Sequence, residues 1–429
     1  MEIVSIVRRR DWVAVFGYVL FVGALAAGYF YNLTFVQLGL VDVGTRVVGL
    51  PAGRVAAILA LLAGVTLVVA IATGTLMHRR GWSARFVVKL RLLAAAVVIL
   101  TVLTPIAPGL GSEGAMVVWV VLAAVALGIG VPSMFGLTCD LVPTRDRGWV
   151  AAVITSAAFL PAAVLATEWE VGAFARMMVG PMVLGALGLG VLAFAPVKVT
   201  QALGRQHEDP RYGVGRFVRV RAASGEGAGG GTDGTPRVGF AVALVLMFGI
   251  YFIDSLGFLR IIDTPVYMGS AWHSGDSGTV WMIGGAHVLA AVVAGILYPA
   301  FTQRALFGWV FALFGLVQLE YVLHSLTTPE LPASLGLPLV YAMAVSIYTV
   351  LNFALWADFS TPATIARNAA LGVGISGWLA SFLSTSLAIL WRSGGVTFAE
   401  HLRAVAAISL ALLCVSGVLL MFPTRRDPT

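Results

Sequence analysis

The chain has 429 residues, of which 59% are hydrophobic and only 11% are charged. Because a soluble domain carries roughly 25% charged residues, this composition excludes most soluble classes and indicates an integral membrane protein. The net charge of +7 does not indicate a nucleic-acid partner, since the basic residues lie in short segments between apolar stretches, where they orient helices against the cytoplasm.

Apolar stretches long enough to cross a bilayer follow one another along the chain. A crossing helix needs about 20 apolar residues. The sequence therefore predicts an all-α integral membrane protein with twelve transmembrane helices, at residues 12–38, 53–77, 86–107, 115–138, 148–167, 172–195, 238–259, 279–300, 305–325, 335–357, 368–391 and 402–422.

A polar stretch separates the first six predicted helices from the last six. Residues 196–237 contain seven basic residues and a glycine-rich run between Gly225 and Gly234, a composition typical of a flexible, solvated linker. We expect a six-helix bundle over residues 1–195, a cytoplasmic linker over 196–237 and a second six-helix bundle over 238–429.

The distribution of basic residues predicts the orientation. With the N-terminus inside the cell, 21 of the 27 Lys and Arg residues fall on the cytoplasmic side, as the positive-inside rule requires. Both termini are therefore expected in the cytoplasm, and the protein is expected to be a multi-pass protein of the cell membrane.

The two halves share sequence features about 220 residues apart. The first set is Asp140, Pro143 and Arg147 against Asp358, Pro362 and Arg367, and the second is Gly74-Thr-Leu against Gly295-Ile-Leu. Internal duplication of this kind is typical of transporters built from repeats, so we predict two pseudo-symmetric bundles.

The loop after the second predicted helix resembles the signature loop of the major facilitator superfamily, Gly-x-Leu-x-Asp-Arg-x-Gly. The matching residues are Gly74, Leu76, Arg79 and Gly81, whereas His78 stands in place of the acidic residue. Residues 140–148 are similar to the Asp-x-x-Pro-x-x-x-Arg-Gly motif of the same family, and the six-plus-six layout extends the likeness over essentially the whole chain.

The resemblance implies a cytoplasmic gate built from these loops. Glycines let helices approach closely, and Arg79 or Arg85 can pair with Asp140. The expected gate residues are Gly74, Arg79, Gly81, Arg85, Asp140, Arg147, Asp358 and Arg367, with a further tight turn at Gly295. His78 could weaken this gate or make it sensitive to pH. The alternative is that the arginines are only positive-inside anchors.

Three ionisable residues lie inside apolar stretches, where charge is costly and is usually kept for function. They are Asp254, His287 and Glu320. Asp254 is the first candidate for substrate binding or ion coupling; the alternative is a structural pair with Arg260 or a nearby helix. His287 can equally be a buried, hydrogen-bonded histidine, and Glu320 can lie at the periphery of the bundle.

In the resembled fold the first, fourth, seventh and tenth helices line a central cavity. Aromatic and amide candidates on these helices are Tyr29, Asn32, Tyr251, Tyr348 and Asn352. Spacings of three or four residues place Tyr29 with Asn32, Tyr251 with Asp254, and Tyr348 with Asn352 on shared helix faces. Such pairs suit a small organic ligand, although tyrosines also form belts at the membrane interface.

The predicted function is secondary transport of a small organic solute by alternating access, carried out by a monomer in the lipid bilayer. No arginine occurs in the fourth helix and no Gly-Pro in the fifth, which argues against a proton-driven drug exporter but leaves uniport, symport with a proton, or another coupling ion open. No ATP-binding motif occurs, and the two cysteines suggest no disulfide, metal or cofactor. The main alternative is a protein of this fold that assembles pigments or acts as a scaffold; a membrane enzyme is a minor one.

Overall fold

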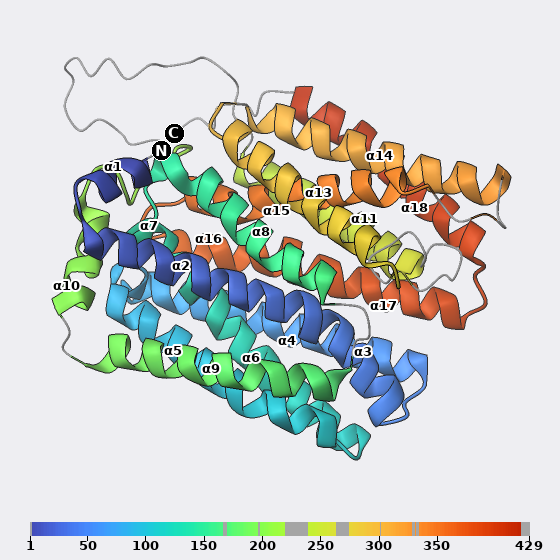
Figure 1. The fold of residues 1–429 in the computed structure, drawn as a ribbon, viewed down its shortest axis with the longest axis horizontal. Helices are drawn as coiled ribbons and strands as arrows, with labels where there is room; N and C mark the ends of the chain where they lie inside the picture. Colours follow the sequence, from blue (N-terminus) through green and yellow to red (C-terminus); the bar gives the residue numbers. More distant parts are fainter. Residues whose placement is uncertain are drawn as a thin grey trace.

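The protein is all-helical in the residues that the computed structural model describes, namely 2–165, 170–195, 198–218, 239–262, 274–300, 302–327, 331 and 334–421. Twelve helices in these ranges are long and apolar enough to cross a membrane, which confirms the predicted number. They run side by side in two groups, one from each half of the chain (Figure 1).

The first group contains the helices of residues 2–194. They are α1 (Glu2–Arg8), α2 (Trp12–Tyr31), α3 (Leu40–Asp42), α4 (Ala52–Arg79), α5 (Phe86–Leu103), α6 (Glu113–Gly136), α7 (Thr138–Leu141), α8 (Arg147–Val164) and α9 (Val171–Phe194). Two π-helical segments, Asn32–Gly39 and Val43–Val47, extend α2 and α3 into one crossing of 36 residues.

The second group follows α10 (Lys198–Gly204). Its helices are α11 (Phe240–Ile262), α13 (Ser277–Leu297), α14 (Gln303–Thr327), α15 (Gly336–Asp358), α16 (Ile365–Gly372), α17 (Ala380–Ser393) and α18 (Phe398–Met421). A third π-helical segment, Val373–Leu379, joins α16 to α17. Among the twelve crossings α15 is the most thoroughly buried.

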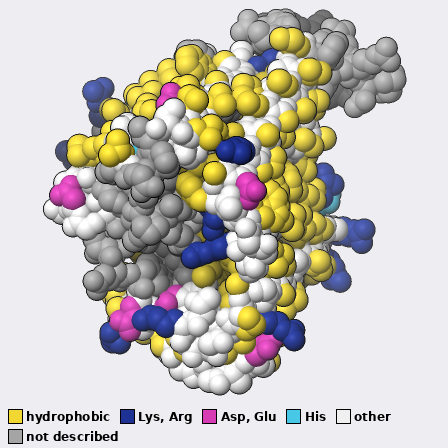
Figure 2. Space-filling view, turned by 90° about the vertical axis from the view of Figure 1, so that its right-hand side faces the viewer, with side chains coloured by type: hydrophobic (Ala, Val, Ile, Leu, Met, Phe, Trp, Pro, Cys, Tyr) yellow, Lys and Arg dark blue, Asp and Glu magenta, His cyan; other side chains and the backbone are white. Residues whose placement is uncertain are grey.

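The outer surface explains why these segments are helical. Large hydrophobic side chains such as Val68, Leu184 and Trp309 are exposed, and Figure 2 shows hydrophobic side chains covering much of the flank of the molecule. Hydrocarbon offers the backbone no hydrogen bonds, so every N–H and C=O must be paired within the helix. The amphipathic patterning of soluble helices is therefore replaced by apolar residues on both the inner and the outer faces.

Close contacts between the two halves depend on small residues. The halves meet where α8 packs on α13 and where α4 packs on α16 and α17. A Cβ atom added to Gly74 would lie 2.7 Å from the carbonyl oxygen of Ala366, and one added to Gly295 would lie 2.6 Å from the Cβ of Ala152. These glycines therefore set the distance between the halves. Gly74 lies inside α4 and Gly295 inside α13, so the tight turn expected at Gly295 does not occur.

One end of the molecule holds α1, α7 and α10, which lie at the left of Figure 1. We call it the linker end. The predicted linker begins there with an ordered stretch, because residues 205–217 form backbone hydrogen bonds with both halves. Residues 219–238, which include the glycine-rich run, lie outside the described residues.

Enlarging Gly295 should force the halves apart. We expect Gly295→Leu to lower the free energy of unfolding by about 1–3 kcal/mol, the usual cost of overpacking, because the new side chain meets Ala152 and the backbone of Gly148. Thermal unfolding in detergent measures the effect. Gly285→Leu on the same helix is the control, since a Cβ there meets nothing within 4 Å; equal effects of the two variants would contradict the packing argument.

Candidate functional site

A cavity of about 960 Å³ lies between the helices. It is bordered by residues of both halves, and seven of the eight predicted substrate or coupling residues line it: Tyr29, Asn32, Tyr251, Asp254, His287, Tyr348 and Asn352. The eighth, Glu320, lies exposed on α14 and is not part of the lining. Two of the π-helical segments also contribute to the wall, through Asn32 and Trp378.

Asp254 is held by two tyrosines of the neighbouring helix. The hydroxyl of Tyr341 donates to its Oδ1 at 2.6 Å and to its backbone oxygen at 2.9 Å, and the hydroxyl of Tyr348 donates to its Oδ2 at 2.5 Å. A buried carboxylate needs such donors, because desolvation without them is expensive. The alternative partner Arg260 instead donates to the carbonyl of Val396.

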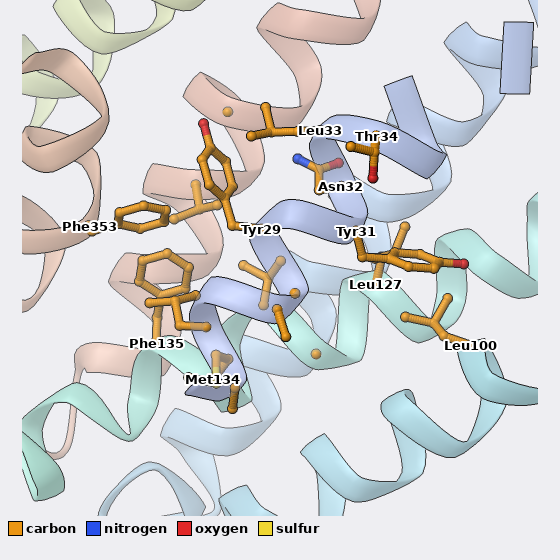
Figure 3. Close-up of a pocket in the computed structure, with 18 of the residues that line it drawn as sticks. Tyr29, Tyr31, Asn32, Leu33, Thr34, Leu100, Leu127, Met134, Phe135 and Phe353 are labelled. Atoms are coloured by element: carbon orange, nitrogen blue, oxygen red, sulfur yellow. The ribbon is translucent and has the colours of Figure 1, made fainter. Parts of the chain in front are cut away.

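Aromatic rings from both halves surround this carboxylate. Tyr251 packs edge-on against Tyr348 with 4.6 Å between ring centroids, and Tyr29 packs edge-on against Phe353 with 4.9 Å. Figure 3 shows Tyr29 on the Phe353 side of α2, while Tyr31 points to the opposite side. The pocket around Asp254 is therefore walled mainly by tyrosine and phenylalanine.

Two polar groups in the cavity lack a hydrogen bond within the described residues. These are the hydroxyl of Tyr251 and the Oδ1 of Asn32. The hydroxyl of Tyr251 lies near the side chains of Tyr29 and Asn352 but does not reach hydrogen-bond geometry with them. Buried polar groups usually have partners, so both groups are available to a ligand or to water.

His287 occupies a more closed position at the cavity wall. Its Nδ1 lies 2.9 Å from the hydroxyl of Ser346, and its ring stacks on Phe159 with 4.5 Å between centroids. This arrangement agrees better with a buried, hydrogen-bonded histidine than with a proton relay.

At the linker end, a cluster of charges joins the halves. Asp358 ends α15 and accepts from Arg147 at 2.9 Å, from Arg216 at 2.7 Å and from the hydroxyl of Tyr298 at 2.9 Å. Arg147 begins α8 in the first half, and the side chains of both Arg147 and Asp358 are fully buried. We call these four residues the Asp358 cluster. It connects the first half, the linker and the second half through one carboxylate.

The linker crosses the gap between the halves next to this cluster. The N–H of Gly213 donates to the carbonyl oxygen of Cys139 in the first half at 3.0 Å, and the N–H of Gly215 donates to the carbonyl oxygen of Ser360 in the second half at 2.8 Å. A Cβ at Gly215 would collide with the carbonyl oxygens of Asp358 and its neighbour, so only glycine lets the chain pass there.

Asp140 has different partners from those predicted. We expected Arg79 or Arg85, but the carboxylate forms a buried ion pair with Lys89 and lies 3.3 Å from the Nδ1 of His207. Lys89 lies near the start of α5, and its buried ammonium group contacts both the carboxylate of Asp140 and the carbonyl oxygen of Gly136 in α6. Arg79 is the last residue of α4 and Arg85 directly precedes α5, and the side chains of both arginines are exposed.

The signature-like loop also contacts the second half. The Nδ1 of His78 lies 2.9 Å from the carbonyl oxygen of Ala363, and the hydroxyl of Ser83 donates to the carbonyl of Pro362 at 2.8 Å. Gly81 lies two residues after the end of α4 and has φ +65°, a left-handed conformation that favours glycine. Arg367, a predicted gate residue, is exposed here.

Sequence reasoning missed several residues of both sites. They are Tyr341 beside Asp254, and Lys89, His207, Arg216 and Tyr298 at the linker end. Tyr341 could have been found, because it lies seven residues before Tyr348 on the same helix face. The basic linker residues gave no signal beyond positive-inside charge.

Comparisons with known proteins agree with this geometry. No family profile and no curated protein matches the chain. Among solved structures it is similar to the human organic anion transporter MFSD10 (TETRAN), with 14% identity, a TM-score of 0.56, and coverage of 95% of this chain and 99% of that one. It is also similar to the proton:xylose symporter XylE bound to 6-bromo-6-deoxy-D-glucose, with 12% identity, a TM-score of 0.57 and 96% of each chain covered.

These comparisons define a class. The chain is a multi-pass membrane protein with the fold of the major facilitator superfamily, and its described residues contain twelve helices that are long and apolar enough to cross a membrane. At identities this low the likeness establishes the fold, and the site must be argued from this chain's own residues.

Removing the charge of Asp358 should weaken the contact between the halves. We expect Asp358→Asn to lower the free energy of unfolding by about 3–5 kcal/mol, because it leaves Arg147 buried without its ionic partner. Thermal unfolding measures the change. Glu113→Gln is the control, since Glu113 and Arg54 form an exposed pair at 3.8 Å of the kind that contributes at most about 1 kcal/mol. A similar effect of both variants would contradict a special role for the cluster.

His207 should make stability depend on pH. The carboxylate of Asp140, 3.3 Å from the Nδ1 of His207, raises the pKa of this histidine above the ordinary value of 6.5, against the opposing effects of burial and of the Lys89 charge. The protonated form is therefore favoured in the folded state, so this contribution is complete below about pH 6.5 and is lost as pH rises through the raised pKa. Unfolding midpoints between pH 6 and 9 should fall less for His207→Gln than for the parent; parallel curves would contradict the assignment.

Proposed function

We propose that the protein is a secondary transporter that moves a small organic solute by alternating access, with Asp254 as the polar centre of its binding site. The observation that carries the proposal is the cavity itself. Its wall combines α2 from the first half with α11 and α15 from the second, and among the lining residues that the structure describes Asp254 is the one Asp or Glu. A site shared by two bundles is the arrangement that alternating access requires.

The state of the structure also fits this mechanism. The linker end is held closed by the Asp358 cluster and by the contacts of Gly74 and Gly295. Positive-inside charge makes this the cytoplasmic end of a protein in the cell membrane. Opening toward the cytoplasm would require the buried ion pair of Arg147 and Asp358 to separate and the linker to release at least one half.

The substrates of the two structural neighbours are not carried over. One is named an organic anion transporter and the other a proton:xylose symporter. The cavity lining described here contains a carboxylate and no Lys or Arg, so it offers an organic anion no cationic partner. A proton or another ion bound at Asp254 remains the candidate for coupling, and a monomer suffices for the mechanism.

The alternative is a protein of this fold that assembles or supports other components without transport. The many Leu, Val and Phe side chains of the cavity wall favour it. The hydroxyl of Tyr251 and the Oδ1 of Asn32, which lack partners among the described residues and line the same cavity as Asp254, favour transport, because a scaffold has no need of unpaired polar groups next to a buried carboxylate.

Rocking of the halves can be measured without knowing the substrate. Spin labels at Arg79 and Arg367, exposed residues of opposite halves, are introduced in a Cys414→Ser background that removes the exposed native cysteine. We expect a second, longer distance whose population rises when Arg147→Gln removes the buried ion pair. Labels at Arg79 and Arg145, both in the first half, should keep one distance. A single Arg79–Arg367 distance in every condition would favour the scaffold.

A further inference from the structure

The cavity extends from Asp254 into a crevice within the first half. One wall of the crevice is the face of α2 formed by Phe16, Val19, Gly23 and Ala27, and the opposite wall is the face of α9 formed by Pro181, Gly185, Gly188 and Leu192. We call this region the α2–α9 crevice. Its residues and Asp254 line the same space of about 960 Å³.

Glycines have a different role here from their role between the halves. A Cβ added to Gly23, Gly185 or Gly188 would meet nothing within 4 Å. At Gly74 and Gly295, by contrast, an added Cβ would collide with another helix. The crevice glycines therefore do not permit a helix contact but keep a space open, because α9 packs mainly on α5 rather than closing onto α2.

The crevice reaches the lipid-facing flank. Val19 is 65% exposed and Val191, which also lines the cavity, is 58% exposed. In a bilayer this space is in contact with acyl chains rather than water, so its walls favour an apolar group.

The other end of the same space favours a positive charge. Asp254 is the one carboxylate in the described lining, and that lining contains no Lys or Arg. Tyr29, Tyr251 and Tyr348 line the same space, and the π-electrons of aromatic rings attract a cation in a desolvated site. An anion would meet the carboxylate with no compensating positive charge.

We infer that the site takes an amphipathic organic cation, with its charged head at Asp254 and its apolar tail in the α2–α9 crevice. This inference rests on the proposed transport function for its biological meaning, although binding itself can be tested separately. The crevice then provides a lateral route by which such a molecule enters the site from the membrane.

The test uses the full chain in lipid nanodiscs and measures the shift of its thermal unfolding midpoint, since a ligand that binds the folded state stabilises it. The probes are decyltrimethylammonium, decyl sulfate of equal chain length and the short cation tetraethylammonium. We expect decyltrimethylammonium to stabilise the parent at a concentration at least tenfold lower than either of the others.

Variants separate the head site from the tail site. Asp254→Asn should weaken the binding of decyltrimethylammonium at least tenfold. Asp254→Glu keeps the charge and should retain most of the binding, which would show that the loss in Asp254→Asn does not come from misfolding. Gly185→Leu should weaken the binding of decyltrimethylammonium but leave the binding of tetraethylammonium unchanged. Gly190→Leu on the same helix is the control, because Gly190 also has open space around it but does not line the cavity.

Each failure has a separate meaning. Equal shifts with decyl sulfate, or shifts that survive Asp254→Asn, would overturn the cation site and indicate partition into lipid. Equal shifts for parent and Gly185→Leu would overturn the tail site. If the cation does not bind but the Arg79–Arg367 spin labels show two distances, the substrate class is refuted and the proposed transport function stands. If the cation binds but the labels show a single distance, the binding site stands and the transport function is refuted.

Discussion

The buried carboxylate of Asp358 is the point on which the closed linker end depends. A charge removed from water is tolerated only when opposite charges and hydrogen-bond donors surround it, and Asp358 meets this requirement with two arginines and a tyrosine. Arg147 comes from the first half and Arg216 from the linker. The electrostatic requirement of one side chain therefore brings three separate parts of the chain into contact.

The duplicated motifs do not give duplicated contacts. Asp140 and Asp358 are equivalent in sequence, yet Asp140 pairs within its own half with Lys89, whereas Asp358 pairs across the halves with Arg147. The linker supplies a basic residue to each, His207 to the first and Arg216 to the second. A guanidinium keeps its charge at all ordinary pH values, whereas an imidazole loses its charge above its pKa. The ionic contact of the linker with the second half is therefore independent of pH, whereas its ionic contact with the first half depends on pH.

Sequence reasoning reached the fold and most of the cavity because both follow from strong physical constraints. Apolar length fixes the crossings, and a polar residue in a crossing is rare enough to point inward, as Asp254 and Asn352 do. The same reasoning could not choose the partner of Asp140, because Lys89, Arg79 and Arg85 are equally basic and only their three-dimensional placement separates them. It ranked Asp254 first and left a peripheral position open for Glu320, which lies exposed on α14, but the apolar neighbours of Glu320 could not decide between a peripheral and an inward position.

One helix carries both the candidate site and the closed end. In α15, Tyr341 and Tyr348 hold Asp254, while Asp358 closes the linker end. Tyr348 and Asp358 are ten residues apart, or about 15 Å along a helix that rises 1.5 Å per residue. Under the proposed mechanism, a cation that neutralises Asp254 would weaken the hydrogen bonds from its two tyrosines, and a shift or rotation of α15 would then be transmitted to Asp358. Two sites are coupled when both shift the equilibrium of one structural element between two arrangements. Helix α15 contacts both sites and is therefore placed to be that element.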